Sequence, residues 1–218
     1  AIGRSQGQRN RRIDGAGLRG ILLEGERSEP LAEGQGQWCL AVPEAAALGQ
    51  AVELFRCSRW NPAGDGAEIW GPFSREGSIP ESDNDRHSGA DDPASAALAL
   101  RFRLEPGAAL ELPVVIAWDL PVTAFATGSR ALRRYSDVFG ASGDNAAAIA
   151  AEALRDWRSW REAIEAWQQP VLERGDLPGP LRMALLNELY DLASGGSLWT
   201  AASPEDPVGR FGIGRAHV

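Results

Sequence analysis

The chain has 218 residues, of which 44% are hydrophobic, and this length fits one large domain or parts of two. Its formal net charge of −8 argues against a nucleic-acid partner, because a phosphate-binding surface needs a basic patch. The sequence has no run of about 18 apolar residues, so we expect no membrane-spanning helix.

The start of the chain carries no recognisable targeting signal. Residues 1–15 are polar and lack the charged and apolar parts of a signal peptide. The first residue is Ala1 rather than methionine, which predicts a fragment and leaves an earlier targeting segment open. We therefore expect a cytoplasmic location or leave the location unknown.

The first half of the chain predicts β-structure. Short apolar or alternating runs, bounded by glycine and proline, occupy residues 17–25, 36–43 and 51–60. The polar stretch 61–93 is too rich in Gly, Pro and Asp to be a core element. Residues 96–121 predict two strands, of which the second is almost continuously apolar and is expected deep in a sheet. This pattern indicates part of an antiparallel β-sandwich.

The second half predicts helices. Residues 131–140 read as a short helix that stops at Gly140, and a longer helix follows over residues 146–169, capped by Asp144 or Asn145 and ended by Pro170. Its expected buried stripe consists of Leu154, Trp157, Ile164 and Trp167. The tryptophans on this helix favour packing anchors over sugar-stacking platforms. A third helix begins near Pro180.

Several familiar motifs do not fit their context. Residues 15–20, GAGLRG, match a dinucleotide-binding pattern, but a strand follows where that fold needs a helix. Cys39 and Cys57 lack metal-ligand spacing and are expected to be buried free thiols. His87 lies in a polar loop, and Asp119 ends a strand, which favours a turn or capping role over catalysis. The sequence therefore predicts no metal site and no cofactor.

Glu188 is the residue that the helical pattern does not explain. In a helix it lies in the middle of an apolar stripe that starts at Leu181. A buried carboxylate is costly unless it is paired or functional. Two interpretations stay open: an ion pair with Arg182 or Arg161, and a carboxylate at the floor of a ligand pocket.

The residues that follow the third helix suit a pocket. Gly195 and Gly196 would allow a backbone or a ligand to approach closely. Ser197 and Trp199 would then offer a hydroxyl group and a stacking face.

Seven segments, in this order, resemble glycoside hydrolase family 116, which includes the non-lysosomal glucosylceramidases, also called bile-acid β-glucosidases. They extend from Gly17 to Gly212. The segments are GLRGILL, GQGQWCLA, LPVVIAWDLP, RRYSDVFG, AWQQPVL, ALLNELYDLASGGSLW and GRFG.

The resemblance implies an N-terminal β-sandwich, connecting helices and an (α/α)₆ catalytic barrel. On this basis residues 1–125 are part of the sandwich, 126–174 are the connecting helices, and 175–212 begin the catalytic domain, including its first helix. The implied reaction is retaining hydrolysis of glucosylceramide or related β-glucosides, with Glu188 of the N-E-L-Y motif as the catalytic nucleophile. The resemblance also implies a peripheral membrane association through a lipid substrate, and it leaves the oligomeric state unknown.

Two departures from the family pattern concern the site. Ser194 stands where the family often has Asp in D-G-G-T, whereas Ser197 keeps the hydroxyl and is the expected substrate-binding residue. The family's acid/base Asp lies beyond GRFG, so we expect this chain to lack it and to be inactive alone.

The last six residues have a separate interpretation. Residues 213–218, IGRAHV, match the translation of ATC GGA AGA GCA CAC GTC from a widely used sequencing adapter, so they are expected to be an artefact.

The rival interpretation of the whole chain is a non-catalytic β-sandwich module, for carbohydrate binding or as a scaffold, with a helical tail. Such a module has no need of an inward carboxylate followed by a Gly-Gly turn.

Overall fold

The computed structural model describes residues 7–44, 52–89, 92–125, 128–188, 197–202 and 211–213. Residues 197, 198 and 211–213 are described by their backbone alone. The chain divides into two compact units. The first contains residues 1–120 and 142–154, and the second contains residues 121–141 and 155–218.

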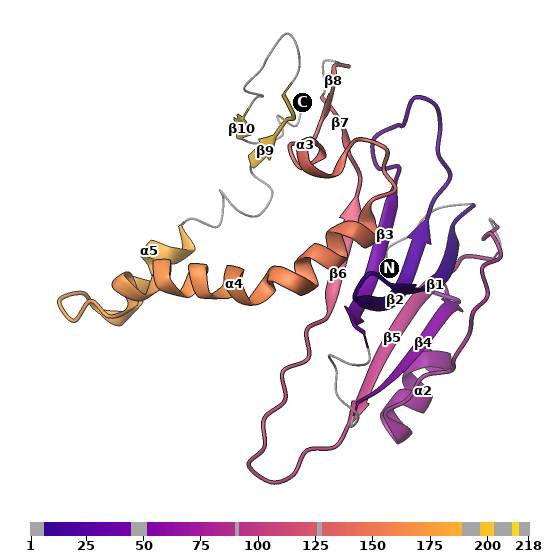
Figure 1. The fold of residues 1–218 in the computed structure, drawn as a ribbon, viewed down its shortest axis with the longest axis horizontal. Coiled ribbons are helices and arrows are strands. Elements are labelled where there is room, and N and C mark those ends of the chain that lie inside the picture. Colours follow the sequence, from indigo (N-terminus) through magenta and orange to yellow (C-terminus); the bar gives the residue numbers. More distant parts are fainter. Residues whose placement is uncertain are drawn as a thin grey trace. The chain divides into compact units, whose positions relative to one another are not determined.

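The first unit is built on two antiparallel sheets. The larger sheet has the strand order β1-β2-β3-β6, and the smaller sheet pairs β4 with β5 (Figure 1). The strands are β1 (Arg9–Gly15), β2 (Leu18–Glu24), β3 (Gln37–Pro43), β4 (Val52–Trp60), β5 (Ser95–Phe102) and β6 (Val115–Asp119). The expectation of a β-rich, antiparallel first part is therefore confirmed.

The glycine-rich GAGLRG segment forms the hairpin between β1 and β2. Gly15 pairs with Leu18, so the loop is Ala16–Gly17, with φ angles of 52° and 81°. Two positive φ angles are typical of the primed turns that match the twist of a hairpin. The segment therefore closes a hairpin and does not open a helix, as the sequence predicted.

One face of the larger sheet packs against the start of α4 (Ala146–Leu172). Leu22, Cys39 and Ala117 are neighbours on three paired strands and share a buried cluster with Ala146 and Ala150. Both alanines have no exposed surface. Their short side chains let the helix backbone approach the sheet closely, and the apolar area removed from water stabilises this contact.

The carboxylate of Asp119 fixes the beginning of α4. Asp119 is fully buried at the end of β6, and its Oδ2 accepts hydrogen bonds from the backbone N–H of Asn145 (2.8 Å) and from Asn145 Nδ2 (3.0 Å). An anion at a helix N-terminus satisfies free N–H groups and interacts favourably with the helix dipole. The predicted capping role of Asp119 is confirmed.

The other face of the larger sheet meets the smaller sheet through polar groups. Arg56 on β4 is 5% exposed, and its Nη1 donates to the carbonyl of Ile13 (3.1 Å) and to Asp14 Oδ2 (2.9 Å). In return, Arg12 Nη2 donates to the carbonyl of Arg56 (2.7 Å), and Asn10 Nδ2 donates to the carbonyl of Ser58 (2.9 Å). These hydrogen bonds give several buried polar groups partners across the two sheets.

The structure corrects several expectations for the first unit. The polar stretch 61–93 contains helix α2 (Ala67–Glu76) and contributes the buried Ile79 to the core beside Cys57 and Ala99. The apolar segment before Pro121 yields only the five-residue β6, at one end of its sheet. Ile116 on β6 is 53% exposed, so this strand is not deep in the sheet.

The second unit contains short elements and the greater part of α4. Strands β7 (Val122–Ala124) and β8 (Arg130–Leu132) form one pair, and β9 (Ser197–Trp199) and β10 (Phe211–Ile213) form another. The helices are α3 (Ser136–Phe139), the later part of α4, and α5 (Gly179–Asn187). Helix α3 ends at Gly140 as predicted.

Two predictions about α4 are wrong. The helix continues through Pro170 to Leu172, because proline tolerates helical φ and interrupts only one backbone hydrogen bond. In the described chain Ile164 and Trp167 are each 54% exposed, and the fully buried residues are Ala146 and Ala150. Of the predicted stripe, Leu154 packs against the buried cluster, whereas Ile164 and Trp167 lie on a part of the helix that has little cover.

The Arg56–Asp14 pair makes the first testable prediction. Burial raises the pKa of the Asp14 carboxyl, but hydrogen bonds from Arg56 and Arg19 outweigh it, so the pKa lies below its ordinary value. A lowered folded-state pKa stabilises the protein above the unfolded-state pKa, and this contribution is lost as the pH falls through the folded-state value. Asp14→Asn should lower the unfolding free energy by about 1–2 kcal/mol at pH 7, less than for a fully buried pair because Asp14 is half exposed.

The control is Asp85→Asn, which breaks the Arg9–Asp85 pair; this pair is 2.7 Å long and exposed on both sides. Urea unfolding at pH 7 and near pH 3 measures both variants. The Asp85→Asn change should have little effect at pH 7, and the Asp14→Asn deficit should shrink at the lower pH. Equal effects of the two substitutions at pH 7 would show that the burial of Arg56 does not matter.

The capping contact gives a second prediction. Asp119→Ala leaves the donors of Asn145 without their acceptor and should cost about 1–3 kcal/mol of unfolding free energy. The control is Asp144→Ala, because Asp144 is one residue from Asn145 but half exposed and 3.9 Å from Arg27. Denaturant unfolding with helical circular dichroism is the measurement. A larger loss for Asp144→Ala would show that the capping carboxylate is Asp144 and not Asp119.

Candidate functional site

Glu188 lies immediately after the last residue of α5. It has helical backbone angles (φ −60°, ψ −20°), and its N–H donates to the carbonyl of Ala184 at 2.9 Å. The helix begins at Gly179, with Pro180 in its first turn, where a missing N–H costs nothing. The predicted start of this helix near Pro180 is confirmed, whereas Glu188 follows the last helical residue instead of lying within the helix, and the predicted continuation to Leu192 lies outside the described residues.

The side chain of Glu188 is exposed among the described residues. Leu181 and Leu185, which share its predicted stripe, are 46% and 48% exposed. The carboxylate is thus open to solvent on a surface that is otherwise apolar.

The two arginines considered as ion-pair partners are engaged elsewhere. Arg182 Nη1 donates to the carbonyl of Leu172 at the end of α4. Arg161 lies 3.7 Å from Glu165, one turn along the same helix. Within the part of the chain that the structure describes, no ion pair to Glu188 is seen, so the structural contacts do not favour the ion-pair interpretation.

Ser197 begins the β9–β10 pair. Its backbone lies opposite Ile213, and its side chain is outside the description. Ile213 is the first residue of the segment interpreted as adapter, and residues 214–218 lie outside the described residues, as do Gly195 and Gly196. The structure therefore describes the chain on both sides of the glycine pair but does not describe how Glu188 and Ser197 are placed together.

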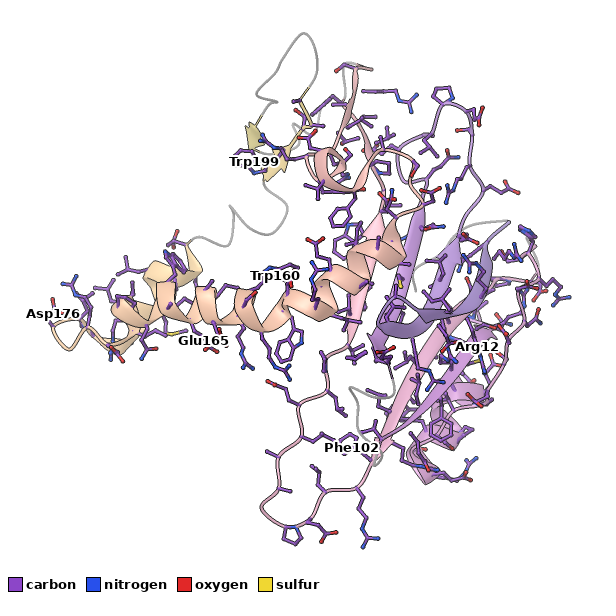
Figure 2. The ribbon with its side chains drawn as sticks, viewed as in Figure 1. Arg12, Phe102, Trp160, Glu165, Asp176 and Trp199 are labelled. Carbon is purple, nitrogen blue, oxygen red and sulfur yellow. The ribbon has the colours of Figure 1, made fainter. Side chains whose placement is uncertain are left out.

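The segment after Ser197 is held to β8. The N–H of Arg134 donates to the carbonyl of Trp199 (2.7 Å), and the N–H of Ala201 donates to the carbonyl of Leu132 (2.8 Å). Thr200 between them is 7% exposed, whereas Trp199 is 52% exposed (Figure 2). These backbone bonds fix the strand, and the half-exposed indole of Trp199 presents an aromatic face to solvent.

The other chemically interesting residues of the sequence have structural roles. Cys39 and Cys57 are buried free thiols, as predicted. Burial raises the pKa of Cys39 to about 12, which keeps it protonated and unreactive. His87 is exposed and lies 3.1 Å from the carbonyl of Gly7. Among the residues that the structure describes, no three His, Cys, Asp or Glu side chains gather as metal ligands would.

A cavity in the first unit was not predicted from the sequence. Strands of both sheets line it, with Trp38 and Trp60 among the lining residues. These residues are far apart along the chain, and only the pairing of the strands brings them together. Regular alternation on each strand gave no signal of a space between the sheets.

Burial of Cys39 leads to a third prediction. Moving a thiol pKa from 9.0 to about 12 lowers the thiolate fraction at pH 8 by about a thousandfold, before any steric protection is counted. Ellman's reagent at pH 8 should therefore label Cys39 only after guanidinium unfolding. The Cys57→Ala variant isolates the reaction of Cys39. Labelling of that variant in its native state as fast as a free thiol would contradict the buried position.

Comparison with known proteins identifies one matching family. The family model described as beta-glucosidase 2, glycosyl-hydrolase family 116 N-term, matches residues 2–160. The matched range includes both sheets and the first half of α4, and it ends before Glu188 and Ser197. In the described residues, no helix combines the length and the apolar character needed to cross a membrane.

Proposed function

The chain belongs to glycosyl-hydrolase family 116, and from this membership we propose that the enzyme containing it is a retaining β-glucosidase acting on glucosylceramide or related β-glucosides. The match over residues 2–160 is the observation that carries the proposal. The N-E-L-Y sequence around Glu188 extends it to the chemistry of a particular residue. In this proposal residues 175–212 begin an (α/α)₆ catalytic domain.

Glu188 is proposed as the nucleophile. Its carboxylate attacks the anomeric carbon and forms a covalent glycosyl–enzyme ester while the bond to the leaving oxygen breaks. A second carboxylic acid gives its proton to that oxygen, then takes a proton from the water that hydrolyses the ester. Retaining glycosidases hold the two carboxyl groups about 5–5.5 Å apart. We propose that the second group lies outside these 218 residues.

Three structural features support this assignment. Glu188 is exposed, so a sugar can reach it, and the arginines nearest in the helical pattern are engaged with other groups. Glu188 directly follows the last residue of α5. Ser197 is proposed to contribute a hydroxyl group to substrate binding, since it follows the glycine pair and opens β9.

The substrate class has consequences for location. A glucosylceramide substrate resides in a membrane, so we propose a peripheral association with the membrane surface through the lipid. An enzyme of soluble β-glucosides would need no such association. Activity toward glucosylceramide in vesicles compared with an aryl β-glucoside in solution distinguishes these two substrate classes.

The test of the proposed nucleophile is Glu188→Gln in the complete enzyme. The amide keeps the shape of the side chain and removes the charge that attacks the anomeric carbon, so kcat on an aryl β-glucoside should fall by at least about a thousandfold. The melting temperature should remain nearly unchanged, because the amide keeps the shape of the side chain and the two candidate arginine partners are engaged with other groups. Glu173→Gln is the matched control, since Glu173 is also exposed near α5 and accepts a hydrogen bond from Gln169.

A mechanism-based label provides an independent readout for the same residue. A 2-deoxy-2-fluoro glucoside should form a stable ester on the wild-type enzyme and none on Glu188→Gln. The tryptic peptide from Met183 to Arg210 contains the labelled position, and fragmentation must separate Glu188 from Asp191, Glu205 and Asp206. A label on another residue would refute the assignment. A large loss of stability in Glu188→Gln with activity retained would also refute it and leave Glu188 as a structural carboxylate.

A further inference from the structure

Helix α5 has two different faces. Its partly buried residues are Gly179, Arg182 and Leu186, and their spacing of three and four places them on one side of the helix. Leu181 and Leu185, on another side, are 46% and 48% exposed. The side that carries Arg182 is therefore the side that α5 turns toward other polypeptide.

Arg182 connects this side of α5 to the end of α4. Its Nη1 donates a hydrogen bond to the carbonyl of Leu172, the last residue of α4, and the two helices lie beside each other at this point (Figure 1). The last carbonyl groups of a helix have no partner within that helix, and a cation is favourable at its C-terminus. The guanidinium of Arg182 meets both requirements. Both residues belong to the second unit.

Helix α5 depends on contacts of this kind. It has nine residues, and none of them is fully buried. Isolated helices shorter than about 12–15 residues are marginal in water, and most helical stability in proteins comes from packing. Because α5 buries little apolar surface, a hydrogen bond from a charged donor, which is stronger than one between neutral groups, contributes a large part of what fixes its orientation.

Glu188 lies on the side of α5 that faces away from Arg182. Its backbone continues the helical path, since its N–H donates to the carbonyl of Ala184. At 3.6 residues per turn, Glu188 follows Leu181 and Leu185 on their exposed side, and it lies about 9 Å along the axis from Arg182. A helix is stiff over this length, so the contact that fixes one side also sets the direction of the carboxylate.

We propose that Arg182 is a positioning residue for the reaction at Glu188. Its hydrogen bond to Leu172 holds one side of α5 against the end of α4, and the carboxylate of Glu188 is thereby held on the opposite side. Arg182 acts through the helix and does not touch the sugar. The inference rests on the proposed function, in which Glu188 is the nucleophile. A displacement of about 1 Å in a reacting group can lower a rate about a hundredfold.

The test uses the complete enzyme and Arg182→Met, which removes the donors and keeps an unbranched side chain. The probe is the 2,4-dinitrophenyl 2-deoxy-2-fluoro-β-glucoside, whose leaving group departs without protonation, so labelling reports the attack by Glu188 alone. The labelling rate at saturation should fall about 10- to 100-fold. The reagent concentration that gives half of this rate should change less than about twofold, because Arg182 does not touch the sugar.

Two further variants make the result specific. Arg182→Lys keeps a cation that can donate to the same carbonyl, and it should label within about threefold of the wild-type rate. Arg174→Met is the matched control, because Arg174 lies between the two helices and pairs with Asp176 at the surface; its labelling should equal that of the wild type. Thermal melts identify loss of folding. If Arg182→Met does not fold, Arg182→Gln replaces it, with the same slower labelling expected.

The outcomes separate this inference from the proposed function. Labelling of Arg182→Met, or of Arg182→Gln in its place, at the wild-type rate would show that Arg182 does not position Glu188. An Arg182→Lys enzyme as slow as Arg182→Met, or a change in the half-saturating concentration alone, would also overturn the inference. A wild-type enzyme labelled at a residue other than Glu188 would instead refute the proposed nucleophile, and both proposals would be wrong.

Discussion

The arrangement of the first unit depends on one carboxylate, that of Asp119. It closes β6 and at the same time accepts two hydrogen bonds from Asn145, the residue before α4. The start of the helix is thereby fixed to the end of the strand. A Cβ on Gly36 would lie 1.9 Å from the carbonyl oxygen of Asp119, so only glycine fits beside this junction. The alanines at 146 and 150 can then pack closely because the start of the helix is already positioned.

The two faces of the larger sheet are stabilised by different interactions. The face toward α4 buries alanine, leucine and cysteine side chains and depends on removing apolar surface from water. The face toward β4 and β5 depends on hydrogen bonds from Arg12, Arg56 and Asn10 to carbonyl groups of the opposite strands. Apolar contacts tolerate small shifts, whereas these hydrogen bonds require a particular register between the sheets. The polar face therefore specifies how the sheets align.

This difference between the two faces explains which elements could be predicted from the sequence. Strands β2, β3 and β4 contain apolar or alternating runs, and all three were predicted. Strand β1, residues RNRRIDG, was missed because its buried side chains are polar and are stabilised by partners on β4 that no local pattern reveals. Helix α2 was missed because it lies in a stretch rich in glycine and aspartate, and it buries none of its residues fully.

The exposure of β6 and of α4 shows a related limit. The sequence correctly predicts a strand before Pro121 and a long helix that begins at residue 146, but it does not tell which side of each another element will cover. Trp118 and Ile164 are both half exposed in the described chain, although the sequence pattern predicts that both are buried. Whether a side chain is buried depends on its tertiary contacts, and the sequence of a single element carries no information about them.

For the candidate site, the sequence supplied the residue and the structure supplied its surroundings. The N-E-L-Y motif singled out Glu188, but the sequence placed it inside the helix, whereas α5 ends at Asn187 in the described residues. The apolar stripe suggested an inward carboxylate, whereas in the described chain Leu181, Leu185 and Glu188 are all exposed. A nucleophilic carboxylate acts efficiently only where water is largely excluded and a second acid is held close by. Catalysis at Glu188 therefore requires further polypeptide to cover this face of α5, and the half-exposed leucines provide the apolar surface on which it would pack.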